Sequence, residues 1–195
     1  MSAEDADEGS VDWHMNLPNL LTLIRILCSP VFVGLVLYGH NSWALAVFLT
    51  AGLTDALDGM IARILDQQTT LGQYLDPLAD KLLLVTAFMV LSFEGVVPLW
   101  VTLVVVSRDV IISVGSLVIH LLREHVDITP TWIGKITTVI QLVYIIAILV
   151  GTTATLPQWL LWSVLAVMVA VTVASGLHYV FRGVKILNPN HGRPA

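Results

Sequence analysis

Apolar residues dominate six stretches of the chain, and short polar or turn-forming segments separate them. The stretches cover residues 20–38, 43–64, 78–93, 98–122, 132–152 and 157–182. A helix needs about 20 mainly apolar residues to cross a bilayer, and the third stretch is the shortest by this measure. The pattern predicts an all-α fold: a polytopic membrane protein built as a bundle of six transmembrane helices.

The tryptophans and the segment before the first span fit this layout. The six tryptophans lie near the proposed span ends, at Trp13, Trp43, Trp100, Trp132, Trp159 and Trp162. Indole side chains prefer the membrane–water interface, which supports those boundaries. Residues 10–19 form either a short N-terminal interfacial helix lying on the membrane or an unstructured lead-in to the first span.

Composition narrows the class of protein. Hydrophobic residues make up 56% of the 195 residues and charged residues 12%, against about 25% charged residues in soluble domains. This balance excludes a nucleic-acid partner and most soluble enzymes. Residues 1–12 carry five of the fourteen acids and are predicted to be disordered. Residues 13–187 are predicted to form a single membrane domain, followed by a C-terminal tail, 188–195.

The basic residues predict the orientation. All nine lysines and arginines lie in or near one set of span ends, and the loops after the first, third and fifth spans contain none. By the positive-inside rule, both termini face the cytoplasm, which predicts a multi-pass protein of the cytoplasmic (inner) membrane. No basic leader precedes the first span, so we expect that span to be retained.

Four aspartates lie where the second span ends and the third begins. Asp55 and Asp58 are three residues apart, and Asp76 and Asp80 are four apart, so each pair shares a helix face. A connecting loop of about ten residues would let the two helices pack as antiparallel neighbours with the pairs facing each other. Clustered carboxylates suit hard divalent cations, and two such ions are a recurrent device for phosphoryl chemistry.

Small residues accompany the aspartates. Gly59, Ala62 and Gly72 leave room for a bulky ligand beside the carboxylates, or they allow close packing of the helices. Arg63 lies one turn beyond Gly59, where it either meets a phosphate or anchors the span end.

The whole spacing resembles the signature of the CDP-alcohol phosphatidyltransferases, a family that transfers a phosphatidyl or related group from a CDP-linked donor to an alcohol and releases CMP. All eight positions of that signature match, as Asp55-x2-Asp58-Gly59-x2-Ala62-Arg63-x8-Gly72-x3-Asp76-x3-Asp80. A six-span chain with this motif across the second and third spans is also similar to that family.

The resemblance implies the parts of an active site. Two divalent ions, Mg²⁺ or Mn²⁺, would bind to the aspartates, with Asp80 also acting as the general base. The donor would be CDP-diacylglycerol, whose lipid tails stay in the bilayer. Its CDP group would bind to Asp58, Gly59, Ala62, Arg63 and Gly72. Similarity to the family also implies a homodimer.

Bases inside the other spans predict an anionic acceptor, because a guanidinium matches a phosphate in charge and geometry. The predicted acceptor-binding residues are Arg108, Lys135 and Arg182. A structural pairing with its neighbour Asp109 is the alternative for Arg108. We expect His178 to be packed in the core.

The identity of the acceptor stays open between two alternatives. The chain resembles a branch of the family that uses glycerol-type acceptors, and the first choice is glycerol 3-phosphate, the acceptor of phosphatidylglycerophosphate synthases. The alternative is phosphatidylglycerol, the acceptor of CMP-forming cardiolipin synthases, because Asp109 and Ser116 depart from the glycerophosphate pattern. A cation transporter is a remote alternative from another class, since intramembrane carboxylates also mark ion pathways.

Overall fold

Six α-helices make up the described part of the chain, residues 17–65, 70–122 and 132–187 of the computed structural model. They are α1 (Leu17–Leu37), α2 (Asn41–Leu65), α3 (Thr70–Phe93), α4 (Leu99–Leu122), α5 (Trp132–Thr153) and α6 (Gln158–Leu187). Those residues contain no β-strand, and the prediction of an all-α fold is confirmed. The proposed interfacial helix, the N-terminal acidic segment and the C-terminal tail lie mostly or wholly outside the described residues.

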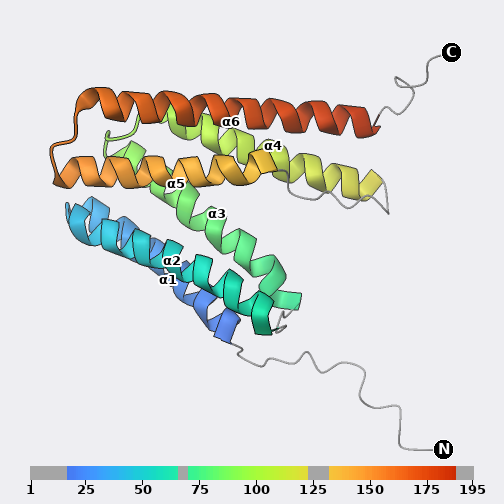
Figure 1. Cartoon of the computed structure of the whole chain (residues 1–195), viewed down its shortest axis with the longest axis horizontal. Helices are drawn as coiled ribbons and strands as arrows, with labels where there is room; N and C mark the ends of the chain where they lie inside the picture. The colour runs from blue at the N-terminus through green and yellow to red at the C-terminus, as the bar shows by residue number, and fades with distance from the viewer. Residues whose placement is uncertain (1–16, 66–69, 123–131, 188–195) are drawn as a thin grey trace, which may run out of the picture.

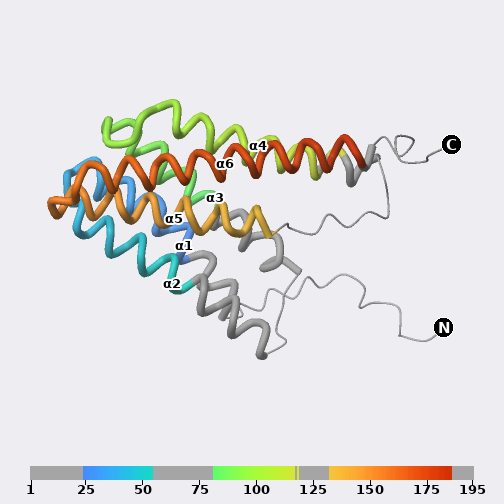
Figure 2. Tube along the Cα trace, turned by 45° about the horizontal axis from the view of Figure 1, so that its top comes forward, coloured from blue at the N-terminus to red at the C-terminus, as the bar shows by residue number. Residues whose placement is uncertain are grey.

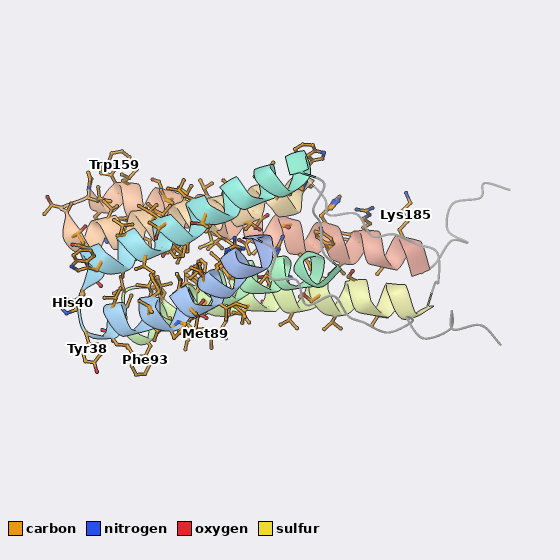
Figure 3. All side chains as sticks on the ribbon, turned by 90° about the horizontal axis from the view of Figure 1, so that it is seen from below. Tyr38, His40, Met89, Phe93, Trp159 and Lys185 are labelled. Carbon is orange, nitrogen blue, oxygen red and sulfur yellow. The ribbon has the colours of Figure 1, made fainter. Side chains whose placement is uncertain are left out.

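Successive helices run in opposite directions, which gives the bundle two distinct ends (Figures 1 and 2). We call the end that carries the α1–α2, α3–α4 and α5–α6 connections the turn end. The opposite end, where α1 begins and α6 finishes, is called the terminal end. In Figure 3, Tyr38, Phe93 and Trp159 mark the turn end, and Lys185 marks the terminal end.

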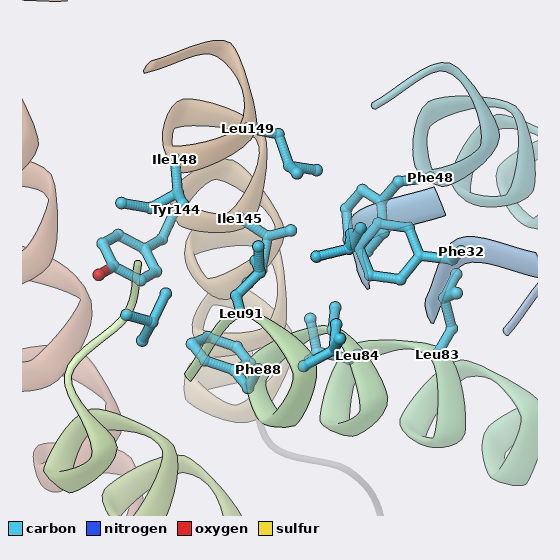
Figure 4. Close-up of a cluster of buried hydrophobic side chains, with 14 of the residues drawn as sticks. Phe32, Phe48, Leu83, Leu84, Phe88, Leu91, Tyr144, Ile145, Ile148 and Leu149 are labelled. Atoms are coloured by element: carbon cyan, nitrogen blue, oxygen red, sulfur yellow. The ribbon is translucent and has the colours of Figure 1, made fainter. Parts of the chain in front are cut away.

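Helices α3 and α5 each contact three other helices. Helix α5 contacts α2, α3 and α6, while α1 packs against α2 and α3, and α4 packs against α3 and α6. The core between α1, α2, α3 and α5 is mainly aliphatic and includes two aromatic pairs (Figure 4): the rings of Phe32 and Phe48 lie 5.6 Å apart, and those of Phe88 and Tyr144 stack at 6.1 Å. These contacts hold the turn-end half of the bundle together, which leaves the terminal end for polar groups.

Glycine caps form two of the connections at the turn end. Gly39 and Gly95 have φ values of 75° and 72°, a region that side chains disfavour. The amide of His40 donates to the carbonyl of Leu35 across the first cap, and the amide of Val96 donates to that of Leu91 across the second. Both are Schellman motifs, which end a helix sharply and allow the next one to return alongside it.

The outer surface of the bundle is largely apolar where its side chains are described, and Figure 3 draws these side chains on the ribbon. Large hydrophobic side chains such as Leu27, Met89, Leu103, Val139 and Phe181 are more than half exposed. The interior, in contrast, contains buried polar groups. Soluble monomers rarely expose apolar surface on this scale, so the outer face fits a lipid environment.

Three helices are long and apolar enough to cross a membrane, through the segments Leu99–Ser116, Trp132–Thr153 and Gln158–Lys185. The other three contain shorter apolar stretches within the residues whose side chains are described, namely Ile24–Leu37, Asn41–Thr54 and Lys81–Phe93. A helical membrane protein is therefore confirmed, while the count of six spans stays a prediction.

The connection between α2 and α3 is shorter than predicted. Helix α3 begins at Thr70 and continues through Pro77, so only residues 66–69 separate it from α2, not a loop of about ten residues. Proline is tolerated inside membrane helices where neighbouring groups satisfy the freed carbonyl. The side chains of the halves of α2 and α3 that carry the motif lie outside the described part, so the predicted facing of the two aspartate pairs stays a prediction.

Candidate functional site

The four aspartates of the motif are carried by helices α2 and α3 near the terminal end. Asp55 and Asp58 lie in the last three turns of α2, and Asp76 and Asp80 lie in the first half of α3. Their side chains, with those of Gly59, Ala62, Arg63 and Gly72, lie outside the described part. The four residues between the two helices can span at most about 18 Å, so the two ends that carry the motif are neighbours.

A cavity of about 290 Å³ opens directly beside this region. Its lining comes from four helices: Lys81 of α3, Arg108, Ile112 and Ser116 of α4, Gly134, Lys135 and Thr138 of α5, and Tyr179 of α6. We call it the cationic cavity. Lys81 follows Asp80 in the chain, so the cavity begins one residue from the motif. A volume near 300 Å³ is at the small end of the range for small-molecule sites.

The α5 wall of the cavity begins near the terminal end of the bundle, whereas Arg108 lies in the middle of the apolar segment Leu99–Ser116. Trp132, at the first position of α5, is 79% exposed at the terminal end. Lys135 and Thr138 lie about 5 and 9 Å further along the helix axis, at 1.5 Å per residue. Tryptophan prefers the membrane interface, so the exposed Trp132 fits a position of this helix end near the membrane surface.

Each of the three cations is held by a defined neighbour. The Nζ of Lys81 donates to Oγ of Ser113 at 3.0 Å, which ties α3 to α4. The Nζ of Lys135 lies 5.4 Å from the centre of the Trp132 ring, a cation–π contact within α5. Both interactions leave further N–H donors of the ammonium groups for a ligand.

Arg108 is the most buried of the three, with 8% of its surface exposed. Its Nη1 donates to Oδ1 of Asp109 at 2.6 Å, and its Nη2 donates to Oγ of Ser175 at 3.0 Å. Its Nε has no hydrogen-bond partner among the described residues. Arg108 therefore pairs with Asp109, as the structural alternative predicts, and it also lines the cavity, while its role in acceptor binding stays a prediction.

A second, smaller cavity of about 80 Å³ lies on the other side of Thr138. It is lined by Arg25 and by apolar or small residues of α2, α3 and α5, namely Ala51, Gly52, Leu83, Leu84, Thr138 and Leu142. Arg25 is 3% exposed. Asp55 is three residues from Gly52, and Asp80 is four residues from Leu84. This smaller cavity therefore lies about one helical turn from an aspartate of α2 and from an aspartate of α3.

The structure brings together two of the three predicted acceptor residues. Arg108 and Lys135 line the cationic cavity, whereas Arg182 is half-buried on α6, three residues beyond Tyr179, and is not part of the lining. The expectation for His178 is wrong: its ring is exposed and lies edge-on to Tyr179. A position on an apolar helix suggested burial, but this face of α6 has no helix packed over it.

Sequence reasoning missed Lys81, Ser113 and Ser175. The sequence does indicate a functional role for Lys81, because this residue directly follows Asp80 and is a base inside an apolar helix. The sequence does not indicate a role for the two serines, since serine is common in membrane helices and each of them bonds to a residue of a helix distant in sequence. Their roles follow only from the packing of α4 against α3 and α6.

The donor set of the motif fits divalent metal ions. Four carboxylates on two neighbouring helix ends provide the oxygen ligands that Mg²⁺ and Mn²⁺ prefer. Among the side chains that the structure describes, no group of three or more His, Cys, Asp or Glu residues gathers into another candidate metal site. Metal binding is therefore assigned to Asp55, Asp58, Asp76 and Asp80 as a proposal.

Comparison with known proteins identifies the class. A family model described as CDP-alcohol phosphatidyltransferase matches residues 15–173, which cover the motif, the cavity residues up to Thr138 and most of α6. The chain therefore belongs to the CDP-alcohol phosphatidyltransferase family.

Curated relatives divide between two activities. A Mycobacterium bovis protein named "Putative cardiolipin synthase" is 38% identical over 125 residues, which cover 64% of this chain and 59% of that protein. A Mycobacterium tuberculosis protein named "Probable phosphatidylglycerophosphate synthase" is 36% identical over 87% of this chain and 82% of its own length. The Escherichia coli K12 protein named CDP-diacylglycerol–glycerol-3-phosphate 3-phosphatidyltransferase is 38% identical over 76% of this chain and 78% of its own. The match thus spans less than two thirds of the first relative.

Proposed function

We propose that this protein transfers a phosphatidyl group from CDP-diacylglycerol to glycerol 3-phosphate in a metal-dependent reaction that releases CMP. The observation that carries the proposal is the cationic cavity, which begins at Lys81, the residue after Asp80. It provides an anion-binding site directly beside the helix that carries the family's proposed base.

The reaction assigns a role to each group of residues. The acceptor hydroxyl oxygen forms a bond to the phosphatidyl phosphorus, the bond from that phosphorus to the CMP oxygen breaks, and the hydroxyl proton passes to the Asp80 carboxylate. Divalent ions held by the aspartates would stabilise the charge that develops on the CMP leaving group. Asp58, Gly59, Ala62, Arg63 and Gly72 would hold the CDP part of the donor, as the motif implies.

The charge of the cavity favours a phosphate monoester as the acceptor. Lys81, Arg108 and Lys135 bring three positive charges, and Asp109 beside Arg108 offsets one, which leaves two. A phosphate monoester carries about 1.5 to 2 negative charges at pH 7, whereas the phosphodiester of phosphatidylglycerol carries one. The relatives named for glycerol 3-phosphate chemistry also align with more of this chain than the cardiolipin relative does.

Phosphatidylglycerol is the second candidate acceptor. The relative named for cardiolipin synthesis is as similar over its aligned segment as the E. coli relative is. A lipid headgroup would enter the cavity while its acyl chains stay in the bilayer. In this reading the activity is that of a CMP-forming cardiolipin synthase.

The test is CMP release by purified protein in phospholipid nanodiscs with CDP-diacylglycerol and Mn²⁺ or Mg²⁺. Glycerol 3-phosphate and phosphatidylglycerol are offered separately, and the lipid product is identified by mass spectrometry. We expect product with glycerol 3-phosphate and none after chelation of the metal. Product with phosphatidylglycerol alone would establish the cardiolipin synthase activity. No CMP with either acceptor would overturn the glycerol-type acceptor and point to inositol phosphate or another alcohol.

Orientation and assembly belong to the same proposal. Lys81, Lys135, Arg182 and Lys185 all lie toward the terminal end, so we place that end and the site on the cytoplasmic side of the inner membrane. Labelling of cysteines introduced at Tyr38 and Lys185 in intact cells checks this orientation: a reagent that cannot cross the membrane should label only the former. The homodimer is checked by the mass of the protein in detergent.

A further inference from the structure

We propose that Ser175 of α6 is a positioning residue that orients the Arg108 guanidinium toward the acceptor. This inference rests on the proposed function, because it assigns the acceptor to the cationic cavity. Ser175 has no exposed surface, and its Oγ accepts a hydrogen bond from Nη2 of Arg108 at 3.0 Å. It does not line the cavity itself and would act only through the arginine.

The position of Arg108 depends on a contact from another helix. Its ion pair with Asp109 joins adjacent residues of α4, so that bond moves with α4 and does not orient the side chain relative to α5 or α6. Residues one apart also point in different directions on a helix. The bond to Ser175 is the one that relates the guanidinium to the wall formed by α6.

Helix α6 also supports the aliphatic part of the arginine. Gly176 follows Ser175, and a Cβ added there would lie 3.6 Å from Cγ and 3.9 Å from Cβ of Arg108. The stem of the arginine therefore passes close over the glycine while the head reaches the serine. Tyr179, four residues after Ser175 and on the same face of α6, lines the cavity above this contact.

The consequence for binding is geometric. A guanidinium recognises a phosphate through two parallel N–H donors, and this requires its plane to be set in advance. With Nη1 held by Asp109 and Nη2 held by Ser175, the plane is set from two helices. Loss of the serine hydroxyl frees one side of the fork, so acceptor affinity should fall while the transfer step is little changed.

The decisive experiment compares Ser175→Thr with Ser175→Val in the full-length protein in nanodiscs. The two side chains have nearly the same shape, and Val has a methyl group where Thr has its hydroxyl. We expect the Val variant to raise the acceptor KM about tenfold or more relative to the Thr variant, because a hydrogen bond to a charged group is lost. The kcat and the KM for CDP-diacylglycerol should agree within about twofold, a split that a merely structural role would not produce.

A matched control lies one turn away on the same face of α6. Thr172 has no exposed surface, and its hydroxyl accepts a hydrogen bond from Nε2 of Gln141 at 3.2 Å, which joins α6 to α5 outside the cavity. Thr172→Val should lower the melting temperature without changing the acceptor KM. Gly176→Ala should leave the melting temperature and the acceptor KM unchanged, since the added methyl makes only ordinary van der Waals contact with Arg108.

A direct measurement of acceptor binding distinguishes a failure of the positioning role from a failure of the proposed function. Calorimetry of glycerol 3-phosphate binding, without donor, should show the same loss of affinity for Ser175→Val relative to Ser175→Thr. Equal KM values and equal affinities in that pair would overturn the positioning role and leave the proposed function intact. A wild-type protein that neither binds the acceptor nor releases CMP would overturn both.

Discussion

The motif helices and the cationic cavity are built in different ways. All eight motif positions lie between residues 55 and 80, on two consecutive helix ends joined by four residues. The cavity next to them collects residues from 81 to 179, on four helices. The first region is a local feature of the sequence, and the second exists only after α3, α4, α5 and α6 have packed.

This difference matches a division of chemical labour. In the proposed mechanism, the short motif binds the donor and the leaving group. The acceptor differs within the family, and a cavity assembled from separate helices can change one wall without disturbing the motif. Substitutions in the motif should therefore affect the transfer itself, whereas substitutions in the cavity should affect mainly the affinity for the acceptor.

The largest effect is expected at Asp80. Asp80→Asn keeps the size of the side chain but removes the carboxylate proposed as base, so kcat for CMP release should fall about 10²- to 10⁴-fold. Glu94→Gln is the matched control, because Glu94 is exposed at the turn end, away from both regions. If Asp80→Asn kept more than a tenth of the wild-type kcat, the result would contradict the role of the motif in the transfer step.

The sequence predicts the fold to a large extent because the membrane constrains it. The predicted ranges 98–122 and 132–152 agree with α4 and α5 to within one residue at each end, because lipid requires long uninterrupted apolar helices. The start of α3 was wrong by eight residues, since Pro77 has the pattern of a helix start in soluble proteins. The packing of α2 and α3 against α1 and α5 has no local signal.

The candidate site also has one part that the sequence predicts and another that depends on the packing of the helices. The aspartates can be recognised from their spacing, and Arg108 and Lys135 could be proposed because a base inside an apolar helix is costly. Ser175 could not be predicted, because its contact with Arg108 joins residues 67 positions apart. Arg182, which was predicted from its charge, lies three residues beyond Tyr179 and outside the described lining of the cavity, so its acceptor role stays a prediction.

The next largest effect is expected at Arg108. Arg108→Lys keeps the positive charge beside Asp109 but loses the planar fork, so kcat/KM for the acceptor should fall about 30- to 100-fold through KM. The KM for CDP-diacylglycerol should not change. Steady-state kinetics with each substrate varied in turn measure both, and a fall in kcat alone would assign Arg108 to the transfer step instead of the cavity.

Lys135 should have a smaller effect because it is exposed and its ammonium is already shared with the Trp132 ring. Lys135→Met should raise the acceptor KM about five- to tenfold, and the rise should shrink at high salt because exposed charges are screened. Lys185→Met, on the exposed end of α6, removes the same charge outside the cavity and should have no effect. Equal effects of the two substitutions would mean that general surface charge, and not the cavity, attracts the acceptor.

The smallest effect is a dependence of acceptor binding on pH, and it distinguishes the two acceptors. The second pKa of a phosphate monoester is about 6, so below that pH the acceptor gains a proton and loses one negative charge. Two net positive charges in the cavity then bind it less well, and the dissociation constant of glycerol 3-phosphate should rise about fourfold at most between pH 7.5 and 5.5. Binding, not turnover, must be measured, because protonation of Asp80 would lower turnover for a separate reason. A phosphodiester does not titrate in this range, so a flat profile for glycerol 3-phosphate would mean that the cavity reads a single negative charge, which favours phosphatidylglycerol.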